Sequence, residues 1–81
     1  MLTPSTTPTL PLAMSTAGTR LKIAAISGGH GLKLKIAEMG LNPGTEIELR
    51  QHERGAVVIS AGNTRYALGA AMAHRIMVQA I

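Results

Sequence analysis

The chain has 81 residues and a formal net charge of +4, and it contains no cysteine, phenylalanine or tryptophan. This length allows one small domain, and the missing cysteine excludes disulfides, thiolate metal sites, iron–sulfur clusters and a thiol nucleophile. The bases are scattered and Tyr66 is the only aromatic residue. This argues against nucleic-acid binding, which usually needs a basic patch and stacking aromatic side chains.

Residues 1–10 are rich in Thr, Pro and Ser and hold few apolar side chains, so we predict a mobile N-terminal tail. The domain is then expected over residues 11–81, with Leu12 packed onto it. No apolar run approaches the ~18 residues that span a bilayer, and no basic stretch followed by an apolar one marks a secretory signal. These features predict a cytoplasmic protein without direct membrane insertion, which reaches a membrane only through a partner.

The first expected element is a strand at residues 21–26, a short apolar stretch flanked by glycine. Leu21, Ile23 and Ala25 are expected to share one face of it. The glycine-rich residues 27–31 break the strand. Phosphate-binding loops occur at such places, but the Gly-Lys-Ser/Thr and GxGxxG patterns are missing, so we interpret this segment as a turn.

Residues 31–39 fit two patterns. Leu32, Leu34 and Ile36 alternate with lysines, as in a strand, whereas Leu32, Ile36 and Met39 have the i, i+4, i+7 spacing of one helix face. The pattern alone therefore leaves strand and helix open.

The end of this segment favours the helix. Gly40 can adopt the left-handed conformation of a Schellman cap, which brings Leu41 against Ile36. Pro43 follows at a point where a helix cannot continue. We therefore predict a short helix that ends at a glycine cap.

The second half of the chain alternates between apolar stretches and turn signals. The expected elements are strands at 45–50, 56–61, 64–68 and 75–81, hairpin turns at 53–55 and 62–63, and one helical turn at 69–74. In total the sequence predicts five short strands and one short helix, with the further helical turn. Short strands between closely spaced turns are typical of small all-β domains, in which closure removes exposed sheet edges. We predict an SH3-like, partly open barrel.

Candidate catalytic and metal-binding residues are few. Aspartate is absent, and Glu46 and Glu48 share what the alternation makes a solvent face, so no enclosed acid–base pair is expected. His30, His52 and His74 show no helical i, i+4 spacing and no nearby cysteine. We interpret them as exposed or capping side chains, and we predict no metal site, no cofactor and no catalysis.

Two segments resemble the FeoA family. Residues 36–47 read IAEMGLNPGTEI, and residues 65–78 read RYALGAAMAHRIMV. An EMGLxPG turn that leads into an alternating strand, followed by aLGxxMAxxIxV near the end, looks like FeoA over residues 12–81. The structural motif residues of this pattern are Gly40, Pro43, Gly44, Gly69 and Met72.

The resemblance implies an SH3-like barrel that serves ferrous iron uptake by contact with FeoB, a membrane permease joined to a G-protein domain. It implies a cytoplasmic accessory protein that its partner recruits to the inner face of the cell membrane. Two other functions fit the sequence. One is a small barrel that binds nucleic acid, and the other is a detached regulatory domain of an iron-dependent repressor, whose C-terminal domain has the same fold.

The predicted helix and its cap offer a candidate surface for partner contact. One short helix is not expected to bury all three apolar side chains of Ile36, Met39 and Leu41, so we predict an exposed apolar patch. Met39 suits such a contact surface because its flexible side chain can repack against a partner. Lys33 and Lys35 are expected to add a basic rim that steers an acidic partner. The alternative is that the three apolar residues belong to the core, with Leu41 used by the cap.

Overall fold

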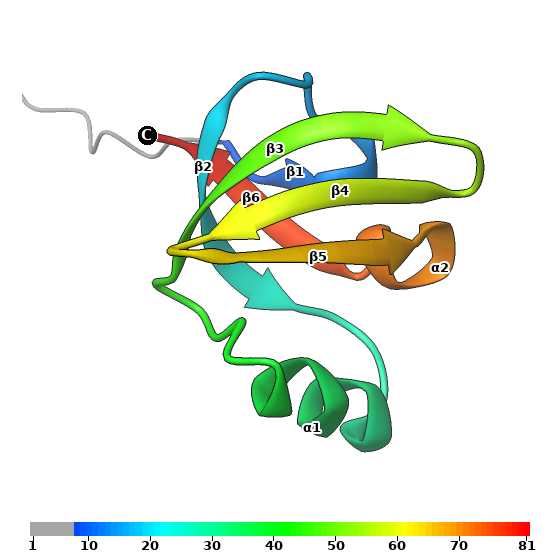
Figure 1. The fold of residues 1–81 in the computed structure, drawn as a ribbon. Helices are drawn as coiled ribbons and strands as arrows, with labels where there is room; N and C mark the ends of the chain where they lie inside the picture. The colour runs from blue at the N-terminus through cyan, green and yellow to red at the C-terminus, as the bar shows by residue number, and fades with distance from the viewer. Residues whose placement is uncertain (1–7) are drawn as a thin grey trace, which may run out of the picture.

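The computed structural model describes residues 8–81, so residues 1–7 of the predicted tail lie outside the described residues. One antiparallel sheet holds all its strands, in the order β1-β6-β2-β3-β4-β5 (Figure 1). The strands are β1 (Leu10–Pro11), β2 (Arg20–Ile26), β3 (Glu46–Glu53), β4 (Ala56–Ala61), β5 (Thr64–Gly69) and β6 (Ile76–Ala80). The helical segments are η1 (Leu12–Met14), α1 (His30–Glu38) and α2 (Ala70–Ala73).

The all-β fold with one short helix is confirmed, but the sheet has six strands where the sequence predicts five. The additional strand is β1, in which Leu10 lies opposite Val78 and Pro11 opposite Met77. A strand of two residues that includes a proline shows no alternation, so the sequence pattern does not reveal it. Leu12, directly after β1, is fully buried, as expected.

The core is aliphatic and forms a single cluster. Alternate positions of the strands supply most of it, and η1, α1 and α2 add one residue each. Its buried members are Leu12, Leu21, Ile23, Ile36, Leu41, Ile47, Leu49, Val57, Ile59, Leu68, Ala73, Ile76 and Val78. Burying one such Leu, Ile or Val side chain stabilises a fold by about 1.5–3 kcal/mol, so this cluster is the main stabilising feature of the domain.

The strands β3, β4 and β5 form two consecutive hairpins, at the turns that the sequence predicts. Glu53 lies opposite Ala56 across the first turn, and Ala61 lies opposite Thr64 across the second. β3 continues three residues beyond the predicted end, because its residues up to Glu53 pair with β4.

A bulge interrupts β2. Its register against β6 shifts between Ile23, opposite Val78, and Ala25, opposite Met77. Leu21 and Ile23 are buried, whereas Ala25 is exposed. The expectation that Ala25 shares their face is therefore wrong, since one extra residue in a strand reverses the alternation beyond it.

The helix α1 and its cap are confirmed. Gly40 has φ +82°, its N–H donates to the carbonyl of Ala37 at 2.9 Å, and the N–H of Leu41 donates to the carbonyl of Ile36 at 3.2 Å. These two bonds and the left-handed residue are the elements of a Schellman cap. The cap turns the chain back toward the strands, and α1 stands below the sheet (Figure 1).

Candidate functional site

Ile36 and Leu41 attach α1 to the rest of the domain. Their exposed fractions are 0% and 1%, and both belong to the core cluster. The expectation that these two side chains are left over at the surface is therefore wrong. The physical reason is that α1 and its cap close the space beneath the curved sheet, and the two side chains fill that space.

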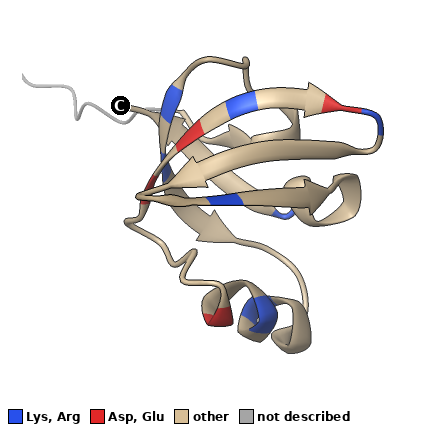
Figure 2. Ribbon diagram, in the orientation of Figure 1, with Lys and Arg blue, Asp and Glu red and all other residues tan. Residues whose placement is uncertain are grey.

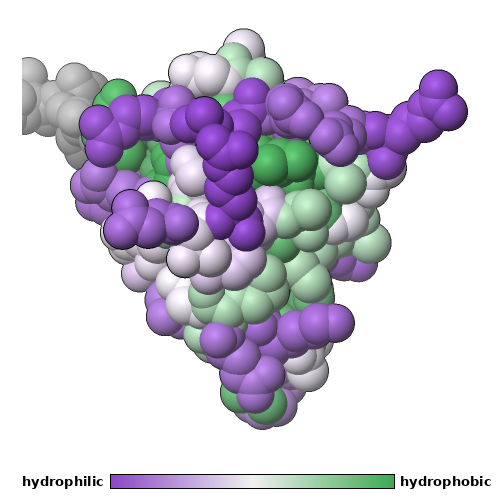
Figure 3. All heavy atoms as spheres, in the orientation of Figure 1, coloured by the Kyte–Doolittle hydropathy of each residue, from purple (hydrophilic) through white to green (hydrophobic). Residues whose placement is uncertain are grey.

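Met39 is half-buried and packs against the core cluster. Its carbonyl oxygen accepts a hydrogen bond of 2.7 Å from the Tyr66 hydroxyl. The large apolar side chain that α1 does expose is Leu34, at 50%. On the face shown in Figure 3, hydrophobic surface continues from the strands down to α1, framed by hydrophilic side chains.

Lys33 and Lys35 are both exposed, and they lie on different flanks of α1. Residues two apart on an α-helix point about 200° apart, because each residue turns the helix by about 100°. Lys33 lines a groove beside α1, so Lys35 projects from the opposite flank. The steering of an acidic partner by these two lysines stays a prediction.

An open, mostly apolar groove of about 340 Å³ lies between β2 and α1. Its lining residues are Ala24, Ala25 and Ile26 of β2, Lys33 and Ala37 of α1, and Leu41, Asn42 and Pro43 of the following turn. Lys33, Leu41 and Pro43 are residues that the sequence analysis singles out. Ala25 is expected only as a residue of the buried strand face. Ala24, Ile26, Ala37 and Asn42 carry no local signal of a site.

The β2 wall of this groove is a strand edge without a strand partner among residues 8–81. β2 pairs with β3 only from Arg20 to Lys22. Ile23 then bonds to the turn before β3: its N–H donates to the Thr45 carbonyl at 2.9 Å, and its carbonyl accepts from the Gly44 N–H at 2.7 Å. Beyond that point β2 pairs with β6 alone, so its other edge borders the groove.

The predicted structural motif residues occupy two turns of the fold. Gly44, with φ +96°, makes the turn that bonds to β2, and the exposed Pro43 beside it lines the groove. Gly69 ends β5 and caps α2, and Met72 of α2 is half-buried against the core. The first motif thus shapes one end of the groove, and the second forms α2, which contributes to the core.

A family model described as FeoA domain matches residues 10–80. The chain belongs to the FeoA family. A relative from Methanocaldococcus jannaschii, named "Putative Fe(2+) transport protein A", is 30% identical to this FeoA domain over 69 residues, which are 85% of this chain and 84% of the relative.

Solved structures agree with this assignment. A crystal structure described as "Iron Uptake Regulatory Protein (FeoA)" has a TM-score of 0.82 and 34% identity, and the match covers 91% of this chain and 99% of that one. A manganese-dependent transcriptional repressor has a TM-score of 0.86 at 19% identity, covering 94% of this chain and 44% of the repressor. At that identity the repressor shares the fold alone. The SH3-like fold is therefore confirmed.

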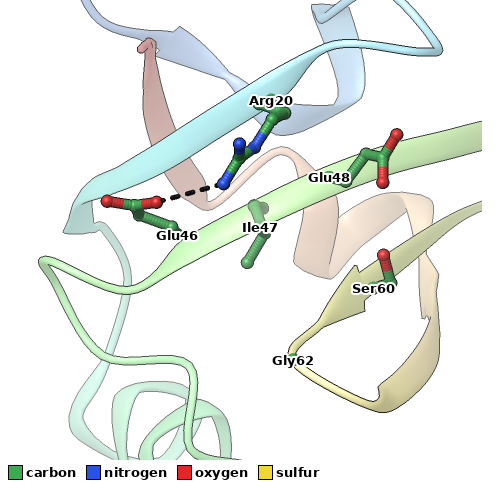
Figure 4. A pocket seen from close by; sticks show the side chains of 6 residues that line it. All are labelled: Arg20, Glu46, Ile47, Glu48, Ser60 and Gly62. Atoms are coloured by element: carbon green, nitrogen blue, oxygen red, sulfur yellow. Dashed lines mark hydrogen bonds and ion pairs between the residues drawn. The ribbon is translucent and has the colours of Figure 1, made fainter.

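A second hollow of this FeoA domain, of about 370 Å³, is polar and lies over β2, β3 and β4 (Figure 4). Within it Arg20 Nη2 lies 3.4 Å from Glu46 Oε1, and both side chains are largely exposed. Glu48 is paired with Arg50 at 3.1 Å. Each carboxylate thus has a cationic neighbour and access to solvent, so the hollow does not enclose an acid–base pair.

The three histidines of the FeoA domain are exposed and lie on separate elements. His30 begins α1, His74 follows α2, and His52 lies on β3 with its Nε2 2.7 Å from the carbonyl oxygen of Ser15. Within residues 8–81, no three acidic or histidine side chains gather closely enough to hold a metal ion. Neither helix of this part of the chain has the length and apolar character needed to cross a bilayer.

Proposed function

We propose that this FeoA domain is a non-catalytic accessory protein of ferrous iron uptake. It acts by contact with a FeoB-type GTPase permease, which recruits it from the cytoplasm to the inner face of the cell membrane. The family match over residues 10–80 and the relative named for Fe(2+) transport support the role in iron uptake. The permease is the partner that the sequence resemblance implies.

The observation that carries protein contact is the groove between α1 and β2. It is open and mostly apolar, and the exposed Pro43 of the first family motif lines it together with the buried Leu41. Apolar surface that a small domain leaves uncovered usually marks an interaction site. Ile36 is part of the core and Met39 packs against it, and neither lines the groove, so neither is part of this contact surface.

Nucleic-acid binding is less well supported. Lys and Arg positions are spread over several strands, loops and α1 (Figure 2). The single aromatic side chain, Tyr66, is half-buried and bonded through its hydroxyl to Met39. Proteins that bind single strands stack bases on exposed aromatic rings beside a continuous basic groove.

The test is deletion of the gene, followed by measurement of labelled ferrous iron uptake and by co-purification of the tagged chain with the permease from solubilised membranes. We expect iron uptake to fall in the deletion strain and to recover when a plasmid supplies the gene. We also expect the permease to co-purify with the tagged chain. Uptake of manganese serves as the control and should not change. Unchanged iron uptake together with no co-purification would refute the proposal, and a change confined to transcription would favour the repressor-like role.

A further inference from the structure

We infer that the groove between α1 and β2 receives an extended segment of the partner, which adds as a strand to the open edge of β2 and places an acidic side chain beside Lys33. The inference rests on the proposed function, because it takes the permease as the source of this segment. Beyond the proposed function, it states how the partner segment binds and which side chains that segment carries.

The open strand edge determines the conformation of the bound segment. Exposed backbone N–H and C=O groups on a strand edge accept an additional strand, and pockets beside the edge select its side chains. Proteins usually protect such edges with proline, charge or very short strands. β1 has two residues and contains Pro11, and β5 carries the exposed Arg65. The free part of β2, formed by Ala24, Ala25 and Ile26, contains neither a proline nor a charge, and its length allows pairing with a short segment alone.

The size of the groove limits its occupant to a short segment. Ala25 and Ala37 are both exposed and line it from opposite elements, β2 and α1. Their small side chains leave room for a backbone between the strand and the helix. A volume of about 340 Å³ lies at the lower end of the range of about 300–1,000 Å³ typical of small-ligand sites. The groove therefore fits a few residues of extended chain rather than a folded domain.

Lys33 determines the charge of the segment. It lines the groove and is exposed. The ion pairs within residues 8–81 join Arg20 to Glu46 and Arg50 to Glu48, so Lys33 is in neither. A cation at the rim of an apolar groove favours a carboxylate on the ligand and orients its approach. We therefore expect an Asp or Glu within an otherwise apolar, β-branched segment.

The first test is selection of short randomised peptides, displayed on phage, against the intact chain. We expect enriched peptides to combine β-branched residues with one Asp or Glu. On addition of a selected peptide to the ¹⁵N-labelled chain, the largest amide shifts should occur at Ala24, Ala25, Ile26 and Ala37. If no peptide is enriched, or if the shifts lie on another face, the inference is wrong.

Two variants of α1 form a matched pair that tests the role of the Lys33 charge. Lys33→Glu should weaken binding of the selected acidic peptide by about tenfold, and selection repeated on this variant should favour peptides with Lys or Arg. Lys35→Glu makes the same change in net charge on the opposite flank of α1, and binding should stay within about twofold. Equal weakening by both variants would show an effect of net charge alone and would overturn the placement of the acid at Lys33.

A variant that fills the groove separates this inference from the proposed function. Ala37 is an exposed helix residue, so Ala37→Trp should fold, which an amide spectrum checks, and should abolish peptide binding. If the permease co-purifies with Ala37→Trp as well as with the unchanged chain, the groove is not its binding site, and the proposed accessory function stands. If peptides bind the groove but the permease never co-purifies, the permease is refuted as the partner and capture of an acidic strand stands.

Discussion

The hydroxyl of Tyr66 on β5 donates a hydrogen bond of 2.7 Å to the carbonyl oxygen of Met39, the residue that caps α1. The last carbonyls of a helix have no amide partner within it, so they depend on groups from elsewhere. Here the only aromatic residue of the chain supplies that group. The bond therefore fixes the cap of α1, next to the turn that lines the groove.

Replacement of Tyr66 by Phe should test this bond, because Phe keeps the ring and removes only the hydroxyl. We expect the free energy of unfolding to fall by about 1 kcal/mol, the usual net contribution of such a bond. Amide exchange should quicken at Gly40 and Leu41, whose N–H groups bond within the cap, more than at β4. Denaturant unfolding and hydrogen exchange measure the two effects. An unchanged midpoint with unchanged exchange would contradict this role of Tyr66.

The cap glycine should be sensitive to any side chain. A Cβ at Gly40 would meet nothing within 4 Å, so the cost of Gly40→Val comes from the backbone, at φ +82°. We expect a loss of about 1–3 kcal/mol in unfolding free energy. Gly31, inside α1, is the control: a Cβ there also meets nothing within 4 Å, and Gly31→Ala should stabilise the domain by about 0.5 kcal/mol. Similar thermal midpoints for both variants would contradict a left-handed Gly40.

The buried and exposed sides of α1 should respond very differently to truncation. Ile36 is 0% exposed, whereas Leu34 is 50% exposed. Ile36→Ala should cost about 2–5 kcal/mol, through lost burial and the cavity left behind. Leu34→Ala should change stability by less than about 0.5 kcal/mol. Chemical denaturation of the two variants measures the difference, and comparable losses would show that α1 packs with another face.

The sequence predicts much of this fold because its signals are local. Residues 56–61 are β-branched between two turns, and they form β4 with the same bounds. Gly40 and the spacing of Leu41 from Ile36 likewise predict the cap, since all its bonds lie within a few residues. Where neighbouring residues determine a structural element, the sequence pattern is sufficient to predict that element.

The groove could not be predicted in the same way, because it depends on pairing between distant residues. The bulge in β2 arises against β6, and β2 loses β3 as a partner after Lys22. Neither feature leaves a pattern in residues 21–26. The prediction that Ile36 and Leu41 remain at the surface is wrong for a related reason. The number of apolar residues on a helix does not determine how many it buries, because the space available to them depends on how α1 sits against the sheet. The groove is therefore formed by the pairing of strands that are distant in the sequence.

The purified intact chain should hold no stoichiometric iron or zinc. It has no cysteine and no aspartate, and His30, His52 and His74 lie on separate elements. Among residues 8–81, none of the three histidines belongs to a group of three or more possible metal ligands. A metal ion needs several converging ligands to be held tightly. Elemental analysis after anaerobic incubation with ferrous iron and gel filtration measures the metal content, and we expect well under one equivalent. His52→Ala serves as the control, since it should leave this low value unchanged. One equivalent of retained metal that His52→Ala abolishes would overturn the prediction and identify His52 as a ligand.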